Sequence, residues 1–111
     1  MFNNSFLKKL NILFIESNTE DREHFSNILY KFFNNVVVCS NGKDGIDNFL
    51  EKRQEYFVDI IICDKTLEDI TGIEVLKKIR EIDSEIPFII TSPKIEVDDL
   101  LIAIKYKATD Y

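Results

Sequence analysis

The fold is decided by one stretch of the sequence, Asp59-Ile60-Ile61-Ile62-Cys63-Asp64, a run of β-branched apolar residues that ends on a carboxylate. Because three successive isoleucines are apolar, both faces of this strand need cover, which is typical of a central strand in a parallel sheet. A polar segment with one glycine, residues 65–72, follows it before a new helical pattern begins. Ligand sites in open parallel sheets lie beyond the carboxyl ends of the strands. Asp64 is therefore a candidate site residue by its position.

A second acid ends an earlier apolar run. Residues 12–15 form another doubly apolar strand pattern, which closes on Glu16 and Ser17. If the two strands are neighbours, Glu16 and Asp64 face each other across the same crevice. Two carboxylates placed in this way repel unless a proton or a cation lies between them. A hard divalent cation with oxygen ligands, above all Mg²⁺, is the usual solution, so the pair predicts a magnesium site.

Composition excludes several classes of protein. The 111 residues, 45% of them hydrophobic and 31% charged, are enough for one globular domain with a real core. The net charge of −6 argues against direct nucleic-acid binding. No apolar run is long enough for a membrane span, and no signal peptide is evident, so we expect a cytoplasmic protein with no membrane contact. Cys39 and Cys63 each close a strand-like run, which predicts buried, reduced thiols.

Strand and helix patterns alternate strictly along the chain. Strands are expected over residues 11–16, 36–39, 59–64 and 87–90, with the start of a fifth at 108–111. Apolar stripes at helical spacing mark four helices, at Phe25, Ile28, Leu29, Phe32 and Phe33, at Ile46, Phe49 and Leu50, at Ile73, Leu76 and Ile79, and at Val97, Leu100, Leu101 and Ile104. Strict alternation with short loops predicts a single α/β domain with a parallel, doubly wound sheet.

Two details of the first helix follow from its sequence. Ser17 and Glu20 are spaced as a capping box for its start. The phenylalanines at helical spacing, Phe25, Phe32 and Phe33, are predicted to pack in the core, as is Phe49 of the second helix. His24 lies beside this apolar stripe and is predicted to be solvated.

The order and spacing of these motifs resemble those of response-regulator receiver domains, over nearly the whole chain. The residues that carry the resemblance are Ile12 to Glu16, Asn41-Gly42, Asp59 to Asp64, Thr71 to Arg80, Ile86 to Ser92, and Ala108 to Tyr111. The resemblance implies a flavodoxin-like sheet with strand order 2-1-3-4-5 and a bacterial two-component function. A histidine kinase or phosphotransfer protein would be the partner, and an output domain a further one.

The resemblance also implies a role for individual residues. Asp64 matches the aspartate that accepts the phosphoryl group, and Glu16 matches the first acid of the pair that holds Mg²⁺. Thr66 matches the residue whose backbone carbonyl ligates the ion. Ser92 matches the hydroxyl that contacts the phosphoryl group, and Tyr111 matches the aromatic side chain that changes rotamer with it.

The chain departs from the family pattern at several positions. Ser17 stands where the second acid, normally a direct metal ligand, is expected, so metal affinity should fall. Glu68 replaces a common proline, and Pro93 follows Ser92 where a small residue is usual. The sequence also ends before the family's lysine and fifth helix, so we interpret residues 1–111 as a receiver domain with an incomplete fifth strand, from the N-terminus of a longer regulator. Without a fifth helix, one sheet face stays partly bare, which predicts self-association as a homodimer.

Two rival functions remain open. The first is a receiver that no longer takes phosphate and acts as a protein-docking module, an idea motivated by Ser17, Pro93 and the missing lysine. The second is an enzyme, because Asp64-Lys65-Thr66 also opens the phosphorylation motif of P-type ATPases. Leu67 and Glu68 do not continue that motif, and 111 residues leave no room for a nucleotide pocket, so we expect no enzymatic activity.

Overall fold

Strands and helices alternate along the part of the chain that the computed structural model describes, residues 7–52 and 58–92. The elements in this part are β1 (Asn11–Ile15), α2 (Thr19–Phe32), β2 (Asn35–Cys39), α3 (Gly42–Lys52), β3 (Ile60–Asp64), α4 (Gly72–Ile82) and β4 (Phe88–Thr91). They agree with the expected strands and helices within a few residues. The predicted helix around Val97 to Ile104, the fifth strand, Pro93 and Tyr111 lie outside the described residues.

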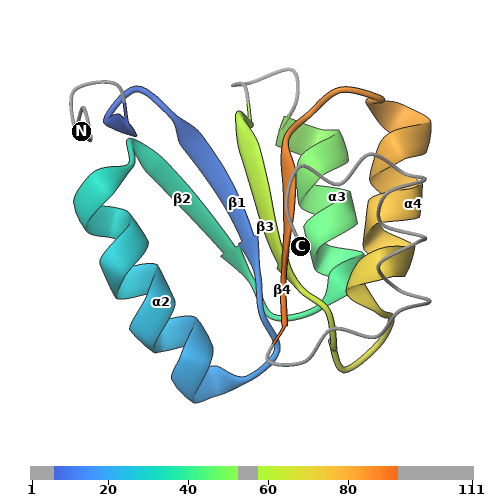
Figure 1. Ribbon diagram of the computed structural model, residues 1–111, viewed down its shortest axis with the longest axis horizontal. Helices are drawn as coiled ribbons and strands as arrows, with labels where there is room; N and C mark the ends of the chain where they lie inside the picture. The colour runs from blue at the N-terminus through green and yellow to red at the C-terminus, as the bar shows by residue number, and fades with distance from the viewer. Residues whose placement is uncertain (1–6, 53–57, 93–111) are drawn as a thin grey trace.

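The strands form one parallel sheet in the order β2-β1-β3-β4. β3 lies between β1 and β4, with Cys63 beside both Ile15 and Ile90. Helix α2 covers one face of the sheet, and α3 and α4 cover the other (Figure 1). This arrangement confirms the doubly wound, flavodoxin-like fold and the first four positions of the expected strand order.

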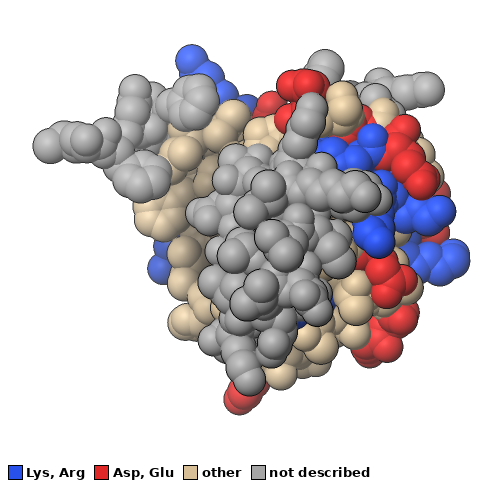
Figure 2. Space-filling view, turned by 45° about the vertical axis from the view of Figure 1, so that its right-hand side comes forward, with Lys and Arg blue, Asp and Glu red and all other residues tan. Residues whose placement is uncertain are grey.

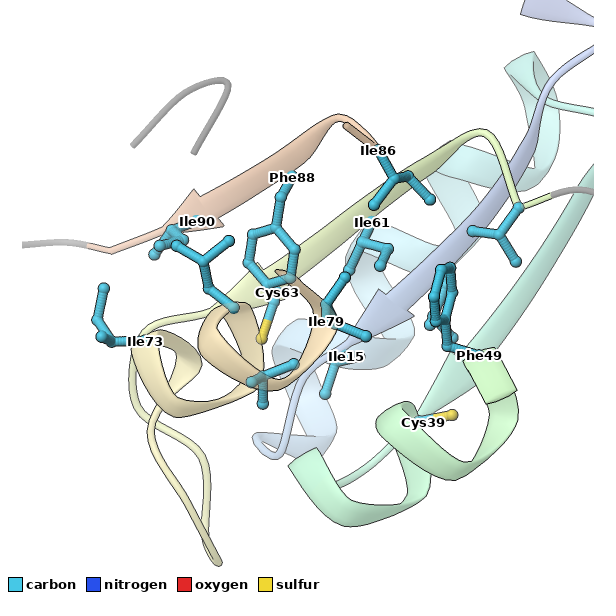
Figure 3. Close-up of a cluster of buried hydrophobic side chains, with 14 residues drawn as sticks. Ile15, Cys39, Phe49, Ile61, Cys63, Ile73, Ile79, Ile86, Phe88 and Ile90 are labelled. Carbon is cyan, nitrogen blue, oxygen red and sulfur yellow. The ribbon is translucent and has the colours of Figure 1, made fainter. Parts of the chain in front are cut away.

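The hydrophobic core lies between the sheet and the helices α3 and α4 (Figure 3). Phe49 of α3 and Phe88 of β4 are its largest fully buried side chains, and Leu76 and Ile79 of α4 are also inaccessible to solvent. Burying a side chain of this size stabilises the fold by roughly 1.5 to 3 kcal/mol. We call this side of the sheet the closed face. Its outer surface, along α4, carries intermixed acidic and basic side chains (Figure 2).

The opposite side, which we call the open face, is packed less completely. Phe25, Ile28 and Phe32 of α2 remain 48%, 37% and 40% exposed. The prediction that Phe25 and Phe32 belong to the core is therefore wrong, whereas Phe49 is buried as predicted. The reason is that part of the wide apolar stripe of α2 does not pack tightly against the sheet, because Phe25 and Ile28 line a cavity together with Phe14 of β1 and Ile62 of β3.

The start of α2 also differs from the prediction. Asn18, rather than Ser17, caps the helix, because its side chain accepts a hydrogen bond from the backbone N–H of Asp21. The predicted Ser17 to Glu20 capping box is wrong, and the hydroxyl of Ser17 instead bonds to two other loops, as described below.

Three further expectations can be compared with the structure. Cys39 and Cys63 are buried free thiols on β2 and β3, with β1 between them, as predicted. His24 is exposed, also as predicted. None of the helices in the described ranges is long and apolar enough to cross a lipid bilayer.

Candidate functional site

The parallel sheet brings two acids together at its carboxyl edge. Ile15 of β1 pairs in register with Cys63 of β3, so the next residue of each strand, Glu16 and Asp64, reaches the same point of the sheet. The two side chains are close enough to influence each other's ionisation. Glu16 is only 6% exposed, and Asp64 is half-buried. The structure therefore confirms that these acids face each other, as the strand ends predict.

The environment of the pair favours its protonated form. Burial, followed by the charge and hydrogen bond of Asp64, raises the pKa of Glu16 to about 7, although the backbone N–H of Asn18 works in the opposite direction. Burial also raises the pKa of Asp64, although the neighbouring Glu16 side chain and the backbone N–H groups of Lys65 and Thr66 act in the opposite direction. Two like charges in this position need a proton or a cation between them.

A tight loop wraps around Asp64. Residues 65–71, which we call the acceptor loop, are closed by a hydrogen bond of 2.8 Å from the Gly72 N–H to the Lys65 carbonyl and by a bridge between Thr66 and Thr71. The loop ends at a complete capping box, in which Thr71 and Glu74 bond each other's backbone N–H. These bonds fix the segment that carries Thr66 directly beside Asp64.

Gly72 is a site residue whose role the sequence did not reveal. A Cβ atom at this position would lie 2.4 Å from the carbonyl oxygen of Asp64 and 3.0 Å from the Cα of Lys65. Only glycine allows the first turn of α4 to approach the end of β3 so closely. The sequence signal was a lone glycine before a helical pattern, which marks a helix start but not this contact.

Ser17 does not direct its hydroxyl to the acid pair. The hydroxyl donates to the Ser40 carbonyl at 2.7 Å and accepts from the Glu68 N–H at 3.0 Å. The Arg22 guanidinium donates hydrogen bonds of 3.1 Å to the backbone carbonyls of Glu16 and Ser17, and these bonds hold the same turn in place. Ser17 is thus near the site but engaged with backbone groups of two loops.

A second unexpected residue joins the acceptor loop to α3. The Asp69 carboxylate accepts bonds from the backbone N–H groups of Gly42, at 2.8 Å, and Lys43, at 2.9 Å. Although burial acts in the opposite direction, these bonds hold the pKa of Asp69 below its ordinary value. Asp69 therefore caps α3 from a distant part of the sequence, which local patterns in the sequence do not indicate.

The expected hydroxyl lies on the neighbouring strand. β4 ends at Thr91, which is the register partner of Asp64 and whose carbonyl accepts a bond of 2.9 Å from the Lys65 N–H. Ser92 is the next residue and is half-buried. The structure thus brings Glu16, Asp64 and the loop of Thr66 together, with Ser92 at the end of the adjacent strand.

The site borders a cavity of about 240 Å³ on the open face. Its lining consists of apolar side chains from α2 and the strands together with two polar ones at the carboxyl edge, namely Phe14, Glu16, Phe25, Ile28, Leu29, Ile62 and Thr91. The Glu16 side chain therefore lines a cavity on the less completely packed side of the sheet.

Comparison with known proteins gives a consistent result. Residues 12–111 match the family model of the response regulator receiver domain. The transcriptional regulatory protein ZraR of Klebsiella oxytoca is 34% identical over 76 residues, covering 68% of this chain and 16% of ZraR. The response regulator ArlR of Staphylococcus aureus is 36% identical over 77 residues, covering 69% of this chain and 33% of ArlR. The chain thus spans a third or less of the length of these relatives.

Solved structures resemble the chain along most of its length. The N-terminal domain of an uncharacterized protein from Wolinella succinogenes superimposes with a TM-score of 0.81 at 27% identity, covering 91% of this chain and 78% of that one. A response regulator receiver domain protein from Clostridium thermocellum has a TM-score of 0.82 at 24% identity, covering 92% and 79%, and shares the fold. With the family match over residues 12–111, these findings show that the chain belongs to the response regulator receiver domain family of two-component signalling.

Proposed function

We propose that the chain is a phosphoacceptor receiver that takes a phosphoryl group on Asp64 from a histidine kinase or phosphotransfer protein. The observation that carries this proposal is the pair of Glu16 and Asp64, which the register of β1 and β3 brings together at the carboxyl edge of the sheet, with Glu16 buried and Asp64 half-buried. A carboxylate that only capped the loop would have no need of a second acid against it. Family membership supports the same role for Asp64.

The proposed reaction forms one bond and breaks another. A carboxylate oxygen of Asp64 attacks the phosphorus of a phosphohistidine in line with the leaving nitrogen, so that a P–O bond forms and the P–N bond breaks. The product is an acyl phosphate, and the histidine nitrogen leaves with the bonding electron pair. The Lys65 N–H, next to Asp64, donates to the Thr91 carbonyl at 2.9 Å, and this bond would help to hold the nucleophile in position.

The donor set fits Mg²⁺. Glu16 and Asp64 supply two carboxylates whose mutual repulsion a cation relieves, and the Thr66 carbonyl would supply a third oxygen. No cluster of three or more His, Cys, Asp or Glu side chains suited to a metal occurs within residues 7–52 and 58–92. Mg²⁺ tolerates this because it keeps several waters and needs only one or two carboxylates. When bound, it would neutralise charge on the acids and the phosphoryl oxygens. The hydroxyl of Ser17, engaged elsewhere, would add little.

Two further residues complete the proposal. The Ser92 hydroxyl would contact a phosphoryl oxygen from the end of β4. Tyr111 would change rotamer with phosphorylation, a role that rests on the family resemblance because this residue lies outside the described part of the chain. The phosphorylated form would act on an output domain or partner protein in the cytoplasm. The domain itself would not be an enzyme.

Intact-mass spectrometry after incubation with acetyl phosphate and Mg²⁺ tests the proposal. We expect the gain of one phosphoryl group, lost when Mg²⁺ is chelated and in Asp64→Asn. Asp59→Asn is the matched control, because Asp59 precedes the same strand at its opposite end, where its carboxylate accepts a bond from the Asn11 N–H. Modification of Asp59→Asn should therefore match that of the unmodified sequence.

The alternative is a docking module that works without phosphate. It is favoured by one observation, that the hydroxyl at the position of the second acid bonds to backbone groups rather than to the acid pair. Absence of any mass gain with Mg²⁺ in excess would support this alternative and contradict the phosphoacceptor role. Turnover of a phosphate ester would contradict both.

A further inference from the structure

We propose that Ser17 is a positioning residue that latches the acceptor loop to the start of α3 and so fixes Asp64 without a bound cation. This inference rests on the proposed function for the meaning of Asp64, but the latch itself can be measured without phosphate or metal. The inference gives a structural role to the hydroxyl of Ser17, which stands where the receiver family has its second acid.

The first step of the argument is that Ser17 joins three segments that are far apart in the sequence. Its own turn follows β1, Ser40 ends the β2 segment that leads into α3, and Glu68 belongs to the acceptor loop. One hydroxyl donates to the Ser40 carbonyl and accepts from the Glu68 N–H, at 2.7 and 3.0 Å. A carboxylate could accept from Glu68 but could not donate to a carbonyl, so this double link requires a hydroxyl.

The second step is that Ser17 itself is held in place. The Arg22 guanidinium donates to the carbonyls of both Glu16 and Ser17. The Glu16 N–H donates to the Cys39 carbonyl at 3.0 Å, which anchors the turn to β2. The hydroxyl therefore projects from a fixed backbone.

The third step leads from the latch to Asp64. Glu68 is in the same closed loop as Lys65 and Thr66, the two residues that follow Asp64. The Lys65 N–H donates to the Thr91 carbonyl at 2.9 Å, and the Lys65 carbonyl accepts from the Gly72 N–H at 2.8 Å. Asp69, the next residue after Glu68, binds the first N–H groups of α3. Ser17 and Asp69 thus tie the loop to the same turn, and a loop held at these points keeps Lys65 and Thr66, and with them the adjoining Asp64, in a fixed position.

Amide hydrogen exchange of the metal-free chain, followed by NMR, tests the latch. Ser17→Ala should make the Glu68 amide exchange about fivefold faster, the effect of losing one hydrogen bond of ordinary strength. It should also shift the amide resonances of Lys65 and Thr66. Ser17→Thr keeps the hydroxyl and should restore both readouts. Ser40→Ala is the matched control, because Ser40 contributes its carbonyl to the latch, and it should behave as the unmodified sequence does.

Several results would overturn the inference. Equal exchange of the Glu68 amide in the unmodified chain and in Ser17→Ala would exclude a latch. A change at Glu68 without shifts at Lys65 and Thr66 would exclude the positioning role. Loss of Glu68 protection on adding Mg²⁺ to the unmodified chain would mean that Ser17 serves as a metal ligand instead. If the latch behaves as expected but acetyl phosphate does not modify Asp64, the proposed function fails and the latch stands.

Discussion

The two faces of the sheet differ in how completely they are packed. On the closed face, residues of β3, β4, α3 and α4 form a core in which Ile61, Cys63 and Phe88 are inaccessible to solvent. On the open face, Ile60, Ile62 and Ile89 of β3 and β4 are only half-buried, and the apolar stripe of α2 is partly exposed. Asp64 follows Ile62 by two positions, so strand alternation assigns the Asp64 side chain to the open face. Asp64 is thus on the side of the sheet that is packed less completely.

The largest expected effect is a difference in how much the two faces of the sheet contribute to the free energy of unfolding. Phe88→Ala removes a fully buried ring from the closed face and should lower the free energy of unfolding by about 3 to 5 kcal/mol. Phe32→Ala, the same change on the open face, removes a ring that is already 40% exposed and should cost less than about 1 kcal/mol. Urea unfolding followed by circular dichroism measures both. Similar losses for the two variants would show that the faces contribute equally.

A substitution at Gly72 tests the close contact between the start of α4 and the backbone carbonyl of Asp64. Because a Cβ here would lie 2.4 Å from the Asp64 carbonyl oxygen, Gly72→Ala should force the start of α4 away from β3. We expect a loss of about 1 to 3 kcal/mol in the free energy of unfolding, the usual effect of overpacking. Lys78→Ala, on the exposed surface of the same helix, is the control and should change stability by less than about 0.5 kcal/mol. A stable Gly72→Ala variant would mean that the contact yields easily.

The acid pair should make stability depend on pH in an unusual direction. Burial and Asp64 raise the pKa of Glu16 from 4.5 to about 7, so the folded state binds this proton more tightly than the unfolded state does. The free energy of unfolding should therefore fall as the pH rises through this window, by on the order of 1 to 2 kcal/mol after allowance for solvent screening. Glu16→Gln should remove that part of the slope. Parallel urea titrations at pH 5 and pH 8 would reveal it, and identical slopes for the two proteins would contradict the argument.

Much of this arrangement could be predicted from the sequence because it rests on periodic patterns. The isoleucines of β3 identified a central strand, and parallel pairing then placed Glu16 beside Asp64. The bonds of Ser17 could not be predicted, since Glu68 is 51 residues away and neighbours it only in the folded chain. The cap that Asp69 provides for α3 could not be predicted from the sequence for the same reason.

The exposed phenylalanines show a different limit of sequence reasoning. Spacing predicts which side of a helix is apolar, but not how much of that side the sheet covers. Phe49 and Phe25 both belong to apolar stripes at helical spacing, yet Phe49 is 2% exposed and Phe25 is 48% exposed. The difference depends on how tightly each helix packs on the sheet, because Phe49 lies in the core cluster whereas Phe25 lines a cavity between α2 and the strands.

The smallest expected effect concerns the open face itself, where an apolar stripe and a cavity of about 240 Å³ adjoin. We expect the chain to self-associate weakly through this surface, because contiguous exposed apolar side chains favour burial against a second copy. Phe25→Asp should weaken the association several-fold, by about 1 kcal/mol, since it places a charge in the contact. Lys43→Asp, which changes an exposed residue of α3 on the other side of the sheet, is the control and should leave association unchanged. Sedimentation equilibrium over a range of concentrations distinguishes these outcomes. A profile that stays monomeric at the highest concentration would mean that the open face does not bind a second copy.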